Sequence, residues 1–398
     1  LRRVQRIDEV SLAESGQPIG DTVGSTATSM LQRTMRKEDV LYLPPDRLRT
    51  MLDLCWGSRG GYQHAVPFQG HASKIDRRRA YLSELAKPIP YRWAEGTAIV
   101  DGYERPGVYI CRLSGTPTIP LKIGAWNEFT EMYEPIDFVG GEVYTVLPTA
   151  EFDGYRAMGI EIEPRWGYAI TEWTSFDGFT DRMYNILQKY ADEPDVLSYM
   201  KAIPNNLVGV MARGDAVRDV RWSLECPGDD WNDVIDEKGF HIENCYDRVL
   251  TSYSYKMHID KSAWIYASNK SAMFEKSAWL HENGHRTLYV HTDGAIYEGH
   301  CEDAAIVDEK RPGYFKDEGQ DWNAKVYRAG SWEMCGVKKQ SGHNEPVNIN
   351  IRHNVNVSRI RQKGGEMSVA GIYRSVYDPT STPSHDVSLA QTFPTMYA

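Results

Sequence analysis

The chain of 398 residues lacks any run of about 18 apolar residues, which is the length that an α-helix needs to cross a bilayer. Its N-terminal region carries Arg2, Arg3 and Arg6, but no apolar segment follows them as it would in a secretory signal. These absences predict a soluble, unsecreted protein with no membrane partner. We therefore expect it to be cytoplasmic.

Cysteine pairs are also missing. The six cysteines are scattered along the chain and none belongs to a C-x-x-C pair, which fits reduced thiols rather than disulfides. Cys226, His241 and Cys245 lie near one another in the sequence, but a fourth ligand at suitable spacing is absent. We expect no zinc site there.

The chain also lacks a positive net charge. The chain has 45 basic and 55 acidic residues, a net charge of -10, which at first argues against a nucleic-acid partner. The distribution is uneven, however, because residues 325–364 contain eight basic side chains and only two acidic ones. This segment could bind a polyanion although the whole protein is acidic.

Apolar periodicity predicts a mixture of helices and strands. The first 40 residues are polar, with one short helical pattern near Met30 to Met35, and the Ser-, Thr- and Pro-rich residues from Asp378 onward predict a mobile tail. The expected helices cover residues 46–54, a short stretch ended by Pro88, 180–211 with a new start at Pro194, and 264–278; the expected strands end at Ile75 or cover 108–113, 142–147, 158–163, 287–291 and 347–357.

Two aspartates occupy positions from which a carboxylate can project into a cleft. Asp76 lies where the strand ending at Ile75 gives way to a helix, and Asp293 lies at the turn between two short apolar strands in residues 288–297. Each also has a simple structural explanation. An Asp before a helix is usually an N-cap, and Asp-Gly is a very common hairpin turn.

Two further segments could present cations to an anionic partner. Lys201, Asn205 and Val208 fall on one face of a helix, which could set an ammonium against a triphosphate and a small apolar surface against a base. Lys325 and Tyr327 point the same way along a strand, which suits contact with a DNA backbone. A solvated lysine and an ordinary strand are the simple alternatives.

In their order and spacing, these segments resemble the protein-primed family B DNA polymerases of phages and linear plasmids, over roughly residues 20–375. That family carries, in this order, a glycine-pair loop, an Asp-x-x-S-L-Tyr-Pro motif, a Lys-x-x-x-Asn-Ser-Leu-Tyr-Gly helix, an Asp-Thr-Asp-Ser hairpin and a Lys-x-Tyr triplet. The similar segments of this chain are residues 58–61, 76–82, 201–209, 291–294 and 325–327.

The chain departs from the family pattern at several positions. Pro204 lies inside the third motif, where it would remove one helical hydrogen bond. The other departures are Arg79, Ala80 and Leu82 for Ser, Leu and Pro in the second motif, Asn206 and Val208 for Ser and Tyr in the third, and His291 and Gly294 for Asp and Ser in the fourth. The two metal-binding carboxylates of the family match Asp76 and Asp293.

The resemblance implies a DNA-directed DNA polymerase that adds deoxynucleotides to a primer 3′-hydroxyl or to a priming protein, in viral or plasmid DNA replication and without proofreading. Asp76 and Asp293 would be the catalytic residues and would hold two Mg²⁺ ions, with Mn²⁺ as a substitute. The implied partners are primer-template DNA, deoxynucleoside triphosphates and a terminal priming protein.

The resemblance also assigns binding residues. Tyr81 matches the position where an aromatic ring stacks on the ribose and excludes a 2′-hydroxyl. The implied nucleotide-binding residues are Tyr81, Lys189, Lys201, Asn205 and Val208, and the implied DNA-binding residues are Arg59, Gly60, Gly61, Lys325, Tyr327, Arg352, Arg359 and Arg361.

The implied fold class is α+β, a right-hand polymerase fold with an antiparallel β palm and helices, two-helix fingers, a β-ribbon thumb and β-rich insertions. The expected parts are an N-terminal segment (1–45) that is the remnant of a junction to an absent exonuclease domain, the first part of the palm (46–99), palm strands with an insertion that contacts a terminal protein (100–175), the fingers (176–214), a second insertion (215–250), the second part of the palm (251–336), the thumb (337–377) and a mobile tail (378–398).

Two alternatives stay open. The first is a catalytically weakened relative that binds nucleic acid or serves as a scaffold in a replication complex, because His291, Gly294 and Val208 replace family residues. The second is a polymerase with unusual template or sugar requirements, because Val208 and Pro204 alter the nucleotide pocket.

Overall fold

The computed structural model describes residues 2–16, 18–19, 23–34, 61–127, 132–212, 216–226, 228, 231–235, 241–251, 258–305 and 312–340. The chain divides into one unit formed by Leu1–Arg213 and Tyr255–Val337 and a second formed by Gly214–Ser254 and Lys338–Ala398. Every described residue of the candidate site belongs to the first unit.

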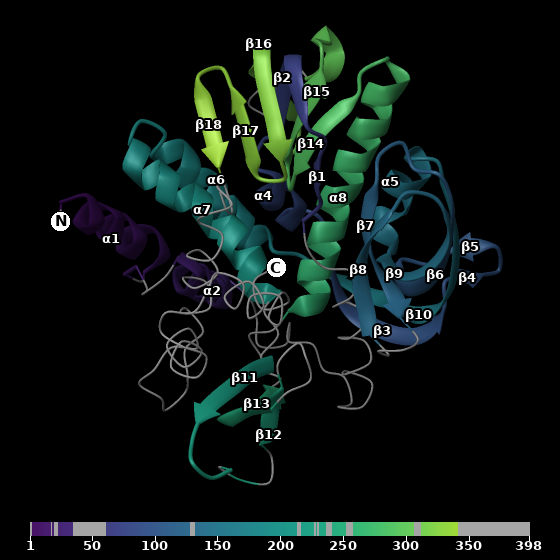
Figure 1. Ribbon diagram of the computed structural model, residues 1–398. Helices are drawn as coiled ribbons and strands as arrows, with labels where there is room; N and C mark the ends of the chain where they lie inside the picture. The colour runs from purple at the N-terminus through teal and green to yellow at the C-terminus, as the bar shows by residue number, and fades with distance from the viewer. Residues whose placement is uncertain are drawn as a thin grey trace. The chain divides into compact units, whose positions relative to one another are not determined.

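A seven-stranded sheet carries both aspartates, and its strand order is β1-β14-β15-β2-β16-β17-β18 (Figure 1). Apolar side chains cover both faces of its central strands, with Ile75 and Val290 in one core cluster and Leu288 and Ile296 in another. The strands are β1 (Gln63–Ala65), β2 (Phe68–Arg77), β14 (Thr287–His291), β15 (Gly294–Glu298), β16 (Phe315–Arg328), β17 (Ser331–Met334) and β18 (Val337–Gln340). Because β2 lies between β15 and β16, segments that are distant in the sequence meet at its end.

A second, six-stranded antiparallel sheet is curled and has the order β3-β10-β6-β9-β7-β8 (Figure 1). Phe152 and Tyr155 of the short helix α5 (Phe152–Ala157) share an apolar cluster with Tyr109 and Leu113 of this sheet. Its strands are β3 (Ile89–Thr97), β6 (Gly107–Gly115), β7 (Leu121–Asn127), β8 (Met132–Phe138), β9 (Gly141–Pro148) and β10 (Ile160–Thr174). A short hairpin of β4 (Ile99–Val100) and β5 (Tyr103–Glu104) and the turn η2 (Thr149–Glu151) complete this part.

The long helix α8 (Ile259–Glu282) contacts both sheets and lies between them in Figure 1. Its residues Met273 and Phe274 belong to the same core cluster as residues of both sheets, whereas Ile265 belongs to a separate helical cluster. A helix that is buried on several sides provides a rigid support. It can therefore fix the relative position of the elements that it contacts.

Four helices pack together in the first unit: α1 (Arg2–Ser15), α2 (Val23–Thr34), α6 (Asp177–Lys189) and α7 (Pro194–Met211). Their shared apolar cluster includes Ile7 and Met30 from the N-terminal helices. The expectation of only one short helical pattern, near Met30 to Met35, in the first 40 residues was therefore wrong. The narrow apolar stripe of α1 is easily overlooked in a polar sequence. Pro204 lies inside α7 without ending it.

The second unit contains a three-stranded antiparallel sheet in the order β11-β13-β12. The strands are β11 (Ala216–Trp222), β12 (Asn232–Ile235) and β13 (His241–Thr251). Val234 and Cys245 are buried against each other and Ile242 packs beside them, so this small sheet has its own apolar contact.

Most of the elements expected from periodicity are confirmed. Residues 108–113, 142–147, 158–163 and 287–291 correspond to β6, β9, β10 and β14, and the expected helices correspond to α6, α7 and α8. β2 continues to Arg77 rather than ending at Ile75. Residues 46–54, the ribbon 347–357 and the tail from Asp378 lie outside the described residues.

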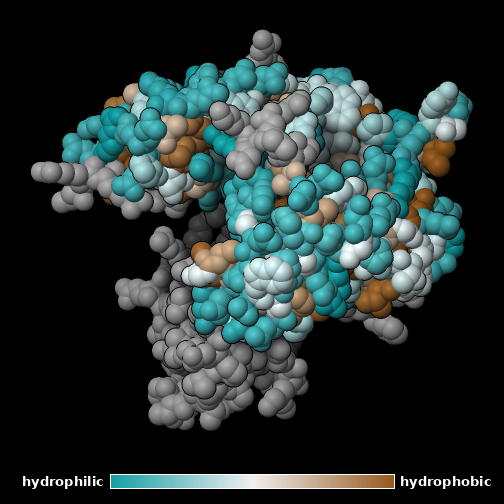
Figure 2. Space-filling model, turned by 90° about the horizontal axis from the view of Figure 1, so that it is seen from above, coloured by the Kyte–Doolittle hydropathy of each residue, from teal (hydrophilic) through white to brown (hydrophobic). Residues whose placement is uncertain are grey.

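The surface in view in Figure 2 is mostly hydrophilic, with hydrophobic side chains in separate spots. Examples of exposed apolar residues in the first unit are Ile99 and Tyr103 of the β4–β5 hairpin. None of the helices that the structure describes is long and apolar enough to cross a bilayer.

Gly167 is the position where we expect the largest effect of a small substitution on stability. A Cβ atom there would lie 2.1 Å from the carbonyl oxygen of Val108 and 2.7 Å from Cα of Tyr109, which are backbone atoms of the paired strand β6. Gly167→Ala should therefore lower the free energy of unfolding by about 3 kcal/mol or more, as measured by urea denaturation. Gly209→Ala in α7 meets no atom within 4 Å and should leave stability unchanged or raise it by up to ~1 kcal/mol.

Candidate active site

Asp76 lies near the end of β2, in the centre of the seven-stranded sheet. It is paired with Gly294 of β15 on one side and with Lys316 of β16 on the other. The following helix α4 (Ala80–Leu85) has Arg79 at its N-cap position and no side-chain cap bond. Asp76 is therefore not a helix cap, and its partly exposed carboxylate remains available for another role.

Asp293 lies in the two-residue turn between β14 and β15. The turn depends on Thr292, whose φ of +57° is unusual for a β-branched residue. Three bonds stabilise the turn: Thr292 N donates to the Tyr62 carbonyl at 2.9 Å, Arg77 N donates to the Asp293 carbonyl at 2.7 Å, and Thr292 Oγ1 donates to Asp293 Oδ1 at 2.8 Å. The backbone next to one aspartate is thus bonded directly to the other aspartate.

The structure places Asp76 of β2 beside the turn that carries Asp293, and the electrostatics of the two residues reflect this. Burial and the negative charge of Asp293 raise the pKa of Asp76 to about 6. Lys316 acts in the opposite direction, since its Nζ lies 3.3 Å from Asp76 Oδ2. Lys316 also pairs with Glu318, and Lys74 Nζ lies 2.6 Å from Glu318. The site is therefore a group of closely coupled charges.

The chemistry of this donor set fits a divalent cation of the Mg²⁺ type. Asp76 and Asp293 offer carboxylate oxygens, which Mg²⁺ prefers. A cation beside them would offset the burial and the repulsion from Asp293 that together raise the pKa of Asp76. Within the part of the chain that the structure describes, no group of three or more His, Cys, Asp or Glu side chains could hold a metal ion. The remaining ligands would have to be water and substrate phosphates.

Tyr81 lies in α4, close to the aspartates, and is only 7% exposed. Its ring packs edge to face against Tyr266 of α8, with 5.5 Å between the ring centroids. Burial raises the pKa of the Tyr81 phenol, and the nearby Tyr266 and Asp293 raise it further. The aromatic ring thus borders the charged group from the side of the helical cluster.

Lys201 and Asn205 are exposed on α7, whereas Val208 is completely buried in the helical cluster. The Val208 carbonyl accepts a bond from Ser262 Oγ of α8 at 3.0 Å, so this end of α7 is covered. The single face expected for the three residues is therefore exposed only in part, and the Val208 side chain does not reach the surface.

Several cations converge on Lys201. Burial lowers the pKa of Lys201, and the positive charges of Arg79, Lys316 and Arg78 lower it further. No ion pair joins Lys201 to an acidic side chain among the described residues. Lys316 also contacts Asp76, and such a concentration of positive charge is suited to a polyanionic ligand.

Lys189 is engaged elsewhere. Its Nζ lies 2.5 Å from Glu14 Oε1 of α1, and the Tyr190 hydroxyl donates to the same oxygen at 2.7 Å. The hydrogen bond to Glu14 raises the pKa of Lys189. Lys189 could bind a phosphate only after leaving this partner.

The expected DNA-binding residues are described only in part. Lys325 and Tyr327 lie on β16, where the Tyr327 hydroxyl donates to Glu333 at 3.0 Å. Gly61 packs against Thr292, because a Cβ at position 61 would lie 2.6 Å from Thr292 Cγ2. The other expected DNA-binding residues, Arg59, Gly60, Arg352, Arg359 and Arg361, lie outside the described residues.

Sequence reasoning missed Lys316 and Glu318. They share one face of β16 beside Asp76, and alternation along a strand would have placed them on the same side. Their importance depends on the pairing of β16 with β2, which joins distant parts of the chain, and no local pattern indicates this pairing.

Comparison with known proteins gives a structural match only. No protein-family model and no curated protein sequence matches the chain. The structure is similar to Phi29 DNA polymerase in its ternary complex with primer-template DNA and incoming nucleotide, with a TM-score of 0.56 and 16% identity over 80% of this chain and 57% of that chain. It is also similar to the complex of that polymerase with single-stranded DNA, with a TM-score of 0.57 and 15% identity over 84% and 62% of the two chains.

The matched region spans less than two thirds of these polymerase chains. At such low identity the similarity describes the fold alone. The chain has a polymerase-like fold, built from helices and antiparallel sheets, one of which is curled.

Proposed function

We propose that the chain is a DNA-directed DNA polymerase that adds deoxynucleotides to a primer 3′-hydroxyl, or to a priming protein, in viral or plasmid DNA replication. The observation that carries the proposal is the position of Asp76, on the central strand β2, beside the Asp293 turn that leads into the neighbouring strand β15. Two carboxylates that meet in a polymerase-like fold are the arrangement that two-metal nucleotidyl transfer needs.

In this proposal each side chain near the two aspartates has one task. Two Mg²⁺ ions, or Mn²⁺ as a substitute, would lower the pKa of the attacking hydroxyl and neutralise charge on the triphosphate. Asp76 and Asp293 would hold them. Lys201 would bind the triphosphate, and the cations of Arg78 and Arg79 would add to the attraction.

Other residues would bind the sugar, the base and the primer. The buried ring of Tyr81 would exclude a 2′-hydroxyl from the nucleotide pocket, and the exposed Asn205 would lie near the nascent base pair. Lys325 and Tyr327 would contact the primer strand from β16. The palm would be the seven-stranded sheet and the fingers would be α6 and α7. The insertion expected within residues 100–175 would contact a terminal priming protein.

A nucleic-acid-binding component of a replication complex, without polymerase activity, is the second candidate. Two observations favour it: His291 stands where the family has a carboxylate, and Lys316 is already paired with Asp76. An extension assay with template, primer, deoxynucleotides and Mg²⁺ separates the two functions. Template-directed incorporation supports the polymerase, whereas DNA binding without incorporation supports the second candidate.

The lysines of α6 and α7 should differ in their effect on nucleotide binding. Lys201→Ala should raise the KM for deoxynucleotides about tenfold, a typical loss for a charge-assisted contact to phosphate. Lys189→Ala should raise it less than about threefold, because Lys189 is paired with Glu14. Steady-state extension at varied nucleotide concentration measures both values. Equal effects of the two substitutions would contradict this assignment.

A further inference from the structure

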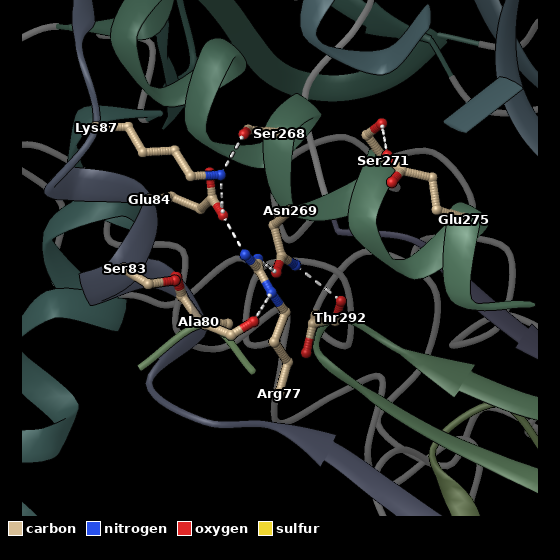
Figure 3. Close-up of polar contacts among 11 residues, drawn as sticks. Arg77, Ala80, Ser83, Glu84, Lys87, Ser268, Asn269, Ser271, Glu275 and Thr292 are labelled. Carbon is tan, nitrogen blue, oxygen red and sulfur yellow. Dashed lines mark hydrogen bonds and ion pairs between the residues drawn. The ribbon is translucent and has the colours of Figure 1, made fainter. Parts of the chain in front are cut away.

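A buried polar network connects the strand of Asp76 to the turn of Asp293 (Figure 3). Arg77, the residue after Asp76, is only 5% exposed. Its Nη1 donates to Asn269 Oδ1 at 2.8 Å and its Nε donates to the Gly313 carbonyl at 2.9 Å. The amide nitrogen of Asn269 completes the connection, since Nδ2 donates to the Thr292 carbonyl at 2.9 Å.

Arg77 therefore reaches two successive carbonyl groups of the turn. Its backbone N–H bonds the Asp293 carbonyl directly, and its guanidinium bonds the Thr292 carbonyl through Asn269. Asn269 lies on α8 and is 1% exposed. Because α8 is buried between the sheets, the amide is held by a rigid element.

The charge of Arg77 is balanced within the same network. Arg77 Nη2 lies 2.5 Å from Glu84 Oε1, and Lys87 Nζ donates to the same carboxylate at 2.9 Å. Burial alone would favour the protonated acid, but the cations of Arg77 and Lys87 lower the pKa of Glu84. Lys87 also donates to Ser268 Oγ of α8 at 3.3 Å, so α4 is connected to the helix that carries Asn269.

The turn needs such support because its conformation is unfavourable. A β-branched residue at a φ of +57° stores about 1–3 kcal/mol of strain and persists only where its surroundings hold it. Asn269 supplies a bond to the carbonyl of this residue, and loss of that bond would allow the turn to relax. Relaxation would change the orientation of the adjacent Asp293 carboxylate.

We infer that Asn269, oriented by Arg77, is a positioning residue that holds the Thr292 turn so that Asp293 faces Asp76, and that it thereby sets the affinity of the pair for a divalent cation. This inference rests on the proposed function, since it assumes that the two aspartates bind metal. Residues that orient metal ligands without touching the metal commonly change affinity by about 10-fold to 100-fold when they are replaced.

The test measures the affinity of the whole protein, without DNA, for Mn²⁺. The electron paramagnetic resonance signal of the free ion reports how much Mn²⁺ is bound. Asn269→Asp keeps the size of the side chain and the acceptor for Arg77 but removes the donor to Thr292. It should weaken Mn²⁺ binding about 10-fold to 100-fold. Arg77→Lys keeps a positive charge beside Glu84 but loses the bond to Asn269, and it should also weaken Mn²⁺ binding. It is the second variant to measure, and it keeps the test possible if Asn269→Asp does not fold.

A matched control separates positioning from general stability. Asp260 is another fully buried polar residue of α8, about 13 Å along the helix from Asn269, and its carboxylate accepts bonds from Trp93 and Lys261. Asp260→Asn should lower the melting temperature and leave the Mn²⁺ affinity within about twofold. A similar loss of affinity in this control would show that Asn269 acts only through stability and would overturn the inference.

The outcomes distinguish the two proposals. If the wild-type protein binds Mn²⁺ and Asp293→Asn abolishes this binding, but Asn269→Asp and Arg77→Lys bind as tightly as wild type, the positioning role is wrong and the proposed function stands. If wild type and Asp293→Asn bind Mn²⁺ equally, the metal site itself is wrong and both proposals fail.

Discussion

Replacement of Asp293 by Asn should lower the rate of primer extension about a thousandfold or more. The change keeps the shape of the side chain but removes one of the two negative charges beside the β2 end. Metal ions contribute several kcal/mol to the stabilisation of such a transition state, and each 1.36 kcal/mol corresponds to about a tenfold change in rate. Single-turnover extension of a labelled primer, with enzyme in excess, measures the chemical step directly.

Two controls make this result specific. Asp101→Asn changes an exposed aspartate at a φ of +52° in the β4–β5 hairpin, a conformation that Asn also adopts readily, and it should extend primers like wild type. Asp76→Asn should be as damaging as Asp293→Asn, and the double variant should lose little more because the two residues act as a unit. Extension by Asp293→Asn at the wild-type rate would show that the aspartate pair does not take part in catalysis.

Truncation of Tyr81 should have the second large effect, on both stability and sugar selection. Tyr81→Ala removes a ring that is 7% exposed and packed against Tyr266, which should cost about 3–5 kcal/mol of unfolding free energy. If the ring excludes a 2′-hydroxyl, the preference for deoxynucleotides over ribonucleotides should fall about tenfold or more, since steric selection by a pocket is of this order. The ratio of kcat/KM for the two nucleotides measures it.

Tyr81→Phe is the matched variant for this prediction. It keeps the ring and its edge-to-face contact while it removes the hydroxyl, so both stability and sugar preference should stay close to wild type. An Ala variant that rejects ribonucleotides as strongly as wild type does would refute the steric role of the ring. Incorporation of ribonucleotides by the wild-type protein would favour the other alternative, a polymerase with unusual template or sugar requirements.

Local patterns predicted the positions of the two aspartates to within one or two residues, because both positions depend on short-range structure. The Asp-Gly pair between apolar strands predicted a turn there, although the turn residues are Thr292 and Asp293 and Gly294 already belongs to β15. The strand expected to end at Ile75 continues to Arg77, so Asp76 lies within β2 and not after it. The strand pairs that place Asp76 beside Gly294 and Lys316 join distant segments. No local propensity encodes such contacts, so Lys316, Glu318 and Asn269 could not be found from the sequence.

Helical periodicity has a different limitation, which α7 illustrates. The spacing of Lys201, Asn205 and Val208 correctly predicts a helix with these residues on one side. It does not predict what covers that side. Because α8 packs over the last turns of α7, Val208 is buried while Lys201 and Asn205 remain exposed. Exposure is thus decided by tertiary packing, which overrides the local pattern.

The attachment of α1 to the α6–α7 pair has a mechanical consequence. Arg6 bonds Glu193 at 2.8 Å, and Glu14 bonds Lys189 at the other end of the same helix. A movement of α6 and α7 must therefore either carry α1 with it or break both ion pairs. Any rearrangement of this part of the molecule should thus involve α1, α2, α6 and α7 as one four-helix body.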